Sequence, residues 1–126
     1  MTIEEVIAEL EKASEGSETL DKQIALVLGW TYHPENARRT INWWIDADEN
    51  ERLDFPAWTR SLDAALTLVP EGHGWTAGKT IQGPQAFAEV LLPYDRGEQF
   101  LTYEVDAATP PIALCIAALR ARSRQP

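Results

Sequence analysis

The segment from Thr109 to Arg122 places the strongest constraint on how this chain can fold. Thr109 suits a helix N-cap, and Pro110 stands where a missing N–H costs nothing, so we expect a helix to begin there. Its larger apolar side chains recur at helical spacing: Ile112, Cys115, Ile116 and Leu119. The alanines between them make a slim helix, which predicts that it packs closely on a sheet.

Three further segments carry an apolar stripe at helical spacing: residues 2–14, 18–28 and 60–70. Thr2 and Glu5 match a capping box at the start of the first segment. Gly29 suits the left-handed position after the second, and Ser61 suits the N-cap of the third. These local signals predict three amphipathic helices.

The stretch between the third helix and the last is typical of short strands. We expect strands at residues 75–81, 86–92 and 100–105, joined by a turn at 82–85 and a loop at 93–99. Connections of this length favour antiparallel hairpins and hence a meander. A small sheet with four helical stripes to bury predicts helices on both faces. We therefore expect an α/β (α+β) fold, a three-layer α/β/α sandwich with a small antiparallel β-meander covered by helices, forming one domain over residues 1–126.

Residues 30–57 are the least regular part of the chain. Pro34 could begin a short helix, whereas Thr40–Ile45 could form a short strand because β-branched and aromatic residues dominate it. The composition favours the strand. Asp46–Arg52 is then expected to be a polar turn.

Two segments resemble the small phage and prophage proteins grouped as the phage ABA sandwich domain. They are Ser61–Gly72, with the sequence SLDAALTLVPEG, and Thr109–Arg122, with the sequence TPPIALCIAALRAR. The likeness covers most of residues 1–122. It implies the sandwich fold and a bacteriophage or prophage origin. It implies no catalytic residue, because no activity is established for that family.

The charge balance restricts the partners. The chain has 20 acidic and 11 basic residues, a formal net charge of −9. This argues against general affinity for DNA, RNA or anionic lipid, since phosphate binding needs a basic surface. An acidic surface that binds a basic protein site is the alternative to a simple role in solubility. No apolar run approaches the roughly 20 residues of a membrane span. No signal-peptide pattern follows Met1, so we expect a protein of the host bacterial cytoplasm.

Candidate nucleophiles and metal ligands are few. Cys115 is the only cysteine and lies on an apolar helical stripe, so we expect it to be buried. His33 with Glu35, and His73 with Glu71, could form a site of two histidines and two carboxylates. Nothing in their spacing requires it, and surface or turn histidines are the simpler interpretation.

The acidic segment after Ile45 partly matches a calcium-binding loop. Asp46, Asp48 and Asn50 match its first three ligand positions, but Glu51 replaces the glycine and Ala57 replaces the bidentate glutamate. A solvated turn is the expected alternative. The sequence also lacks the glycine-rich motifs that bind phosphate. We therefore expect no metal, no cofactor and no catalytic residue, and a protein that is not an enzyme.

The surplus of tryptophan provides the strongest candidate site. Five tryptophans occur in 126 residues, and Trp43 and Trp44 are adjacent, shortly after Arg38 and Arg39. Neighbours on a strand point to opposite faces, so one indole should face the core and the other should face outward. An exposed tryptophan beside arginine can stack a ring or anchor a protein interface. We predict that Trp43, Trp44, Arg38 and Arg39 bind a ligand or partner.

These observations favour a non-catalytic, phage-encoded accessory protein that acts on its host, by countering a defence or inhibiting a host enzyme. One alternative is a sponge that sequesters a nucleotide-like small molecule. Another is a structural or assembly component of the phage. The expected partner is thus a host protein or a small nucleotide-like ligand, and homo-oligomerisation stays open.

Overall fold

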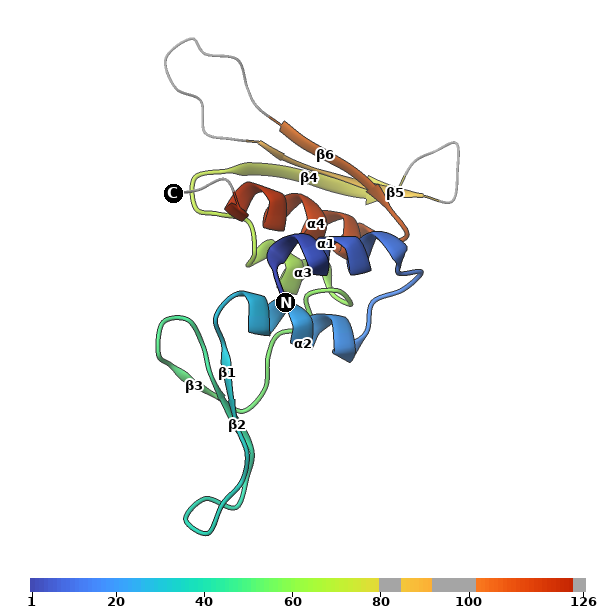
Figure 1. Ribbon diagram of the computed structural model, residues 1–126. Coiled ribbons are helices and arrows are strands. Elements are labelled where there is room, and N and C mark those ends of the chain that lie inside the picture. The colour runs from blue at the N-terminus through green and yellow to red at the C-terminus, as the bar shows by residue number, and fades with distance from the viewer. Residues whose placement is uncertain (80–84, 92–101, 124–126) are drawn as a thin grey trace.

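The computed structural model describes residues 1–79, 85–91 and 102–123 and has an α+β fold (Figure 1). These residues form four helices and two antiparallel sheets of three strands each. The helices are α1 (Ile3–Lys12), α2 (Glu18–Val27), α3 (Leu62–Leu66) and α4 (Pro110–Ser123). One sheet joins, in this order, β1 (Thr31–His33), β2 (Trp43–Ile45) and β3 (Glu51–Arg52). The other joins β4 (Gly74–Lys79), β5 (Ala86–Leu91) and β6 (Thr102–Ala107).

Capping contacts confirm the predicted starts of the first two helices. The Thr2 hydroxyl accepts the Glu5 N–H at 3.2 Å, and the Glu5 carboxylate accepts the Thr2 N–H at 3.3 Å, which completes the capping box. The Ser17 hydroxyl accepts the Leu20 N–H at 3.1 Å at the start of α2. Gly29, with a φ of 96°, turns the chain away after α2.

The third helix is shorter than the predicted 60–70. Ser61 caps it as expected and accepts the Ala64 N–H at 3.3 Å. After Leu66 the N–H groups bond to carbonyls three residues back, so the helix tightens into turns before Pro70. The proline that was expected to end the helix therefore follows a short run of turns.

Helix α4 lies at the centre of the fold. The Thr109 hydroxyl accepts the Ile112 N–H at 3.3 Å, which confirms the predicted cap. Every side chain from Ile112 to Leu119 is buried, so the buried surface is wider than the single stripe expected from the sequence. The helix packs on β4, β5 and β6, and it also contacts α1 and α3 (Figure 1). The small side chains of α4 are explained by this close packing, with the sheet on one side and helices on the other.

The β4–β5–β6 sheet confirms the predicted antiparallel meander. Ala88 of β5 pairs with Ala77 of β4 and with Val105 of β6. Ala86, Ala88 and Val90 alternate along β5 and are fully buried. Most of the predicted turn at 82–85, the whole predicted loop at 93–99 and the chain after Ser123 lie outside the described residues.

The predicted three-layer arrangement is not confirmed. The face of this sheet opposite α4 carries Phe87, Glu89, Glu104 and Asp106, and none of the described helices packs on it (Figure 1). The helical stripes bury against one another instead, since α1 contacts α2 and α4, and α3 contacts α4. A second helical layer on the far face was therefore not needed to bury them.

The segment expected to be irregular forms a projecting arm, defined as residues 31–55 (Figure 1). The favoured strand at Thr40–Ile45 is confirmed in its second half as β2, and no helix begins at Pro34. The short strands β1 and β3 were not predicted. They pair with β2 on either side, with Tyr32 and Arg52 both opposite Trp44.

One pair of carboxyl groups on the uncovered sheet face predicts a pH effect. Glu89 and Glu104 pair in register, and the hydrogen bond to Glu104 raises the pKa of Glu89, helped by desolvation and repulsion. A pKa raised on folding stabilises the protein below the ordinary value of 4.5, and this stabilisation is lost as the pH rises through the folded-state value. Glu89→Gln should therefore stabilise the protein at pH 7 and flatten the decline in stability above pH 4.5.

Urea denaturation at pH 4.5 and at pH 7 measures this change in the free energy of unfolding. Asp106→Asn is the matched control. It removes one negative charge from the same face of the sheet, but Asp106 lies opposite Phe87 and not opposite another carboxylate. An unchanged pH dependence in Glu89→Gln, or an equal change in both variants, would contradict the prediction.

Candidate functional site

The adjacent tryptophans of β2 lie on opposite faces of the arm, which confirms the prediction that one is buried and one is not. Trp44 is 5% exposed and makes an edge contact with Phe55, with ring centroids 5.2 Å apart. It also contacts Tyr32, at 5.1 Å between centroids. Trp43 is partly exposed and stacks on His33, its partner across the strands, at 5.1 Å and 14°. Trp44 thus belongs to the hydrophobic core cluster, and Trp43 faces away from the core.

The arginines of the predicted site differ in their surroundings. The guanidinium carbon of Arg39 lies 4.2 Å from the centroid of the Trp43 ring, and one terminal nitrogen is 3.3 Å from Glu51. Arg38 is exposed in the loop between β1 and β2, where the Asn36 carboxamide accepts its backbone N–H at 2.8 Å. The structure therefore brings Trp43 and Arg39 together, while Trp44 and Arg38 lie apart from them. Among the three best-formed pockets of the described residues, Trp44 lines one, whereas Trp43, Arg38 and Arg39 line none of them.

A groove of about 540 Å³ lies on the Trp44 face of the arm, between the arm and α2. We call it the aromatic groove. Its apolar lining consists of Tyr32, Trp44, Leu53 and Phe55. Its polar lining consists of Glu18, Thr19, Lys22, Asn42 and Asp54. The ammonium of Lys22 lies 5.9 Å from the centroid of the Tyr32 ring, so α2 contributes a cation to an otherwise aromatic wall.

Apolar exposure is concentrated in the arm. The described residues expose six large apolar side chains, and three of them belong to the arm: Tyr32 at 44%, Ile41 at 48% and Leu53 at 71%. The sequence analysis did not select these residues. The available signal was weak, because Leu53 is a single apolar residue between Arg52 and Asp54. Apolar side chains gathered on a projecting element are typical of an interaction surface.

The polar turn expected at Asp46–Arg52 is confirmed for residues 46–50, whereas Glu51 and Arg52 form β3. The carboxylate of Asp46 is hydrogen-bonded within the protein itself. Asp46 Oδ1 accepts the N–H groups of Asp48 and Asn50, both at 2.9 Å, and Oδ2 accepts Nε–H of Arg52 at 3.1 Å. These hydrogen bonds, led by that from Asn50, hold the pKa of Asp46 below its ordinary value. Within residues 1–79, 85–91 and 102–123, no group of three or more histidine, cysteine or acidic side chains is placed to hold a metal ion.

The histidines make local contacts. A ring nitrogen of His33 lies 3.0 Å from the Thr31 hydroxyl, on the strand that carries both residues. The Nδ1 atom of His73 lies 3.3 Å from the Glu71 carbonyl oxygen, in the turn before β4. Each histidine thus makes a contact within its own segment, but the Nε2 atom of His73 is buried without a hydrogen-bond partner among the described residues.

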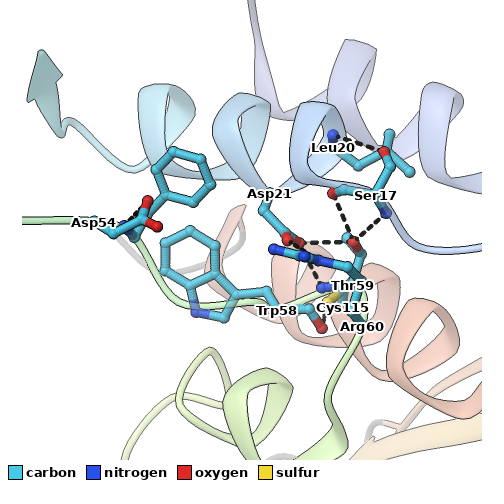
Figure 2. A network of polar contacts seen from close by, with 9 residues as sticks. Ser17, Leu20, Asp21, Asp54, Trp58, Thr59, Arg60 and Cys115 are labelled. Atoms are coloured by element: carbon cyan, nitrogen blue, oxygen red, sulfur yellow. Dashed lines mark hydrogen bonds and ion pairs between the residues drawn. The ribbon is translucent and has the colours of Figure 1, made fainter.

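A buried polar network joins α2 to the segment before α3 (Figure 2). Asp21 is fully buried, and its Oδ1 accepts the Thr59 N–H at 2.7 Å and the Thr59 hydroxyl at 2.6 Å. Its Oδ2 accepts Nε–H of Arg60 at 2.9 Å. The Thr59 hydroxyl also accepts the Ser17 N–H at 3.0 Å. No sequence pattern pointed to this network. Its buried polar groups are paired with one another, which indicates a structural role.

Cys115 belongs to the same region and is buried, as predicted (Figure 2). Its thiol donates to the Trp58 carbonyl oxygen at 3.2 Å. Burial, followed by repulsion from Asp21, raises the pKa of the thiol well above its ordinary value. A protonated, inaccessible thiol is unsuited to nucleophilic chemistry.

In comparisons with known proteins, no family model, no curated protein and no solved structure matches this chain. The resemblance to the phage ABA sandwich domain therefore stays a prediction. None of the described helices is long and apolar enough to cross a membrane.

Proposed function

We propose that this chain is a non-catalytic, phage-encoded binding protein that acts on a host protein through its arm. The observation that carries the proposal is the exposure of Tyr32, Ile41 and Leu53 on one projecting element. Two of these, Tyr32 and Leu53, also line the aromatic groove. Buried apolar anchors surrounded by polar groups supply most of the energy of protein interfaces.

The charge of the arm indicates what kind of surface the partner presents. The arm has three arginines and six acidic residues: Glu35, Asp46, Asp48, Glu49, Glu51 and Asp54. An acidic surface favours association with a basic one and discriminates against other acidic proteins. The partner we infer therefore presents an apolar side chain to the groove and basic side chains around it.

The protein-binding interpretation is favoured over the nucleotide sponge for a geometric reason. A sponge built from the four predicted residues needs them around one cavity. Trp43 and Trp44 face opposite ways, and the Arg39 guanidinium is engaged by Trp43 and Glu51. The exposed Tyr32 and Leu53 line the aromatic groove on the Trp44 face of the arm, away from Trp43 and Arg39. Exposed apolar side chains of this kind suit a protein partner better than a nucleotide. Self-assembly is the remaining alternative, and the experiment below separates it.

Site-specific photo-crosslinking in a bacterial host tests the proposal. A photoreactive amino acid at position 53 should give one discrete adduct that excess wild-type chain suppresses. The matched control is position 75, because Trp75 is also an exposed large apolar residue but lies on the other sheet. An adduct of twice the 14.1 kDa chain would indicate self-assembly and overturn the proposal. The same adducts from both positions, or none from position 53, would also overturn it.

The identified partner then permits a quantitative measurement. Leu53→Asp should weaken its binding by about tenfold or more, since losing an interface anchor costs at least about 1.4 kcal/mol. Trp75→Ser should leave binding within about twofold of wild type. Equal losses in both variants would show that the arm has no special part in binding.

A further inference from the structure

We propose that a second cleft, between the arm and the body, binds a small anion that carries a planar ring. This cleft has a volume of about 450 Å³, which lies within the roughly 300–1,000 Å³ of small-molecule sites. We call it the arm–body cleft, and it is distinct from the aromatic groove. Its lining comes from the β2–β3 turn, the chain after α2, the end of α3 and the end of α4.

Arg122 of α4 supplies the first cationic group. Its Nε–H donates to the Leu68 carbonyl oxygen at 2.6 Å, and Nη2 lies 3.5 Å from the Thr67 carbonyl oxygen. Burial lowers the pKa of this guanidinium, and none of the described carboxylates forms an ion pair with it. Carbonyl contacts fix the side chain but leave its positive charge uncompensated, so an anion in the cleft would meet an oriented donor.

Arg52 supplies the second cationic group from the arm. Its Nε–H donates to Asp46 Oδ2, and both oxygens of that aspartate are already occupied by protein donors. The Arg52 side chain is 55% exposed, and its terminal nitrogens have no recorded partner among the described residues. A ligand would therefore be held between a guanidinium of the arm and one of the body.

The walls of the cleft can take a ring. Trp30 and Trp58 line it and pack edge to face, with centroids 5.6 Å apart and planes at 82°. The Trp58 Nε1–H donates to the Thr67 hydroxyl at 3.1 Å, which fixes that indole. Trp58 is only 2% exposed, so the partly exposed Trp30 presents most of the ring surface. A fixed aromatic surface beside guanidinium groups favours a flat anionic ligand over a simple ion.

Two carboxylates of the lining, Asp46 and Asp48, oppose an anion. Asp46 is paired with Arg52, so these two charges offset each other, and Asp48 is the one without an ion pair among the described residues. Asp48 lies in the turn that lines the cleft, and its side chain is exposed. Its carboxylate repels an anionic group, so it limits the affinity. Neutralising Asp48 should therefore strengthen binding, a result that general destabilisation of the protein would not produce.

Titration with adenosine 5′-monophosphate (AMP), followed through the tryptophan indole N–H signals in ¹H–¹⁵N spectra, tests this site. The Trp30 and Trp58 signals should shift saturably, and that of Trp75 should not. Arg122→Gln should weaken AMP binding by about tenfold or more, the scale of one charge-assisted hydrogen bond, and Asp48→Asn should strengthen it by about threefold. Arg120→Gln is the matched control, because its guanidinium contacts Glu11 instead.

Each alternative outcome overturns the proposal. The absence of a saturable shift up to about 10 mM AMP would remove the site. Inorganic phosphate binding as tightly as AMP would remove the role of the ring, and adenosine doing so would remove the role of the anion. If Arg122→Gln does not fold, the more exposed Arg52→Gln carries the same expectation, and unchanged AMP affinity in that variant would contradict the proposal.

Discussion

Replacing Asp21 with alanine should lower the free energy of unfolding by about 3–5 kcal/mol, because it deletes the acceptor of a buried charged network. The Thr59 N–H and hydroxyl both donate to Asp21, and Arg60 pairs with its other oxygen. Without the carboxylate, buried donors lose their partner and cannot regain water. Urea denaturation of the purified chain measures the difference.

The partner of Asp21 gives the control. The Arg60 side chain is 47% exposed, so its ion pair with Asp21 is partly screened by water. Arg60→Ala leaves the buried Oδ2 of Asp21 without that partner, but Oδ1 keeps both Thr59 donors, so we expect a smaller loss of about 1–3 kcal/mol. If Arg60→Ala destabilises the protein as much as Asp21→Ala does, the salt bridge and not the buried hydrogen bonds is the main contribution. A loss below about 1 kcal/mol in Asp21→Ala would show that the network matters little.

This network also shows what the sequence cannot reveal. Asp21 and Thr59 are 38 positions apart, and neither belongs to a motif that links them. Gly16 was recognised only as a helix break. In the structure the chain at Gly16 passes so close to the Thr59 carbonyl oxygen that a Cβ would overlap it. Contacts of this kind depend on how helices meet, and no local pattern encodes them.

Helices and long strands were predictable because their signals are local. The Thr2–Glu5 capping box and the Ser61 cap each fix a boundary within a few residues, and the β4–β5–β6 meander follows from short connections. The strands β1 and β3 have three and two residues, too few for a periodic pattern. They exist through pairing with β2, which is a tertiary interaction.

The layer arrangement could not be derived from stripes alone. A stripe shows that one side of a helix is buried but not which element buries it. The sequence analysis assigned all four stripes to the sheet, whereas α1, α2 and α3 bury theirs within a helical layer that includes α4. The continuous run of small and apolar residues in α4 was the available sign that this helix is covered on both sides.

The candidate site was predictable in part for a similar reason. The alternation of side chains along a strand gave the opposite orientations of Trp43 and Trp44, once a strand was assumed. It could not show that Arg39 would fold back on Trp43 and pair with Glu51. It also could not show that Tyr32 and Leu53 would meet at one groove, because Tyr32 lies in β1 and Leu53 follows β3.

The two adjacent tryptophans should differ sharply when each is replaced by alanine. Trp44→Ala should cost about 3–5 kcal/mol, because it removes a large buried ring from the hydrophobic core cluster. The indole is 5% exposed and touches Tyr32 and Phe55. Trp43→Ala should cost about 1 kcal/mol, since its partly exposed ring contacts only side chains of the arm, His33 and Arg39.

Urea denaturation gives the two free energies, and amide hydrogen exchange shows where protection is lost. In Trp44→Ala the amides of β1 and β2 should exchange faster than those of β5, because the arm depends on this indole while the meander is held by α4. Equal destabilisation by both substitutions would contradict the assignment of one indole to the core and the other to the surface. Loss of protection in β5 to the same extent as in β2 would show that arm and body unfold together, and that the arm cannot move independently when it meets a partner.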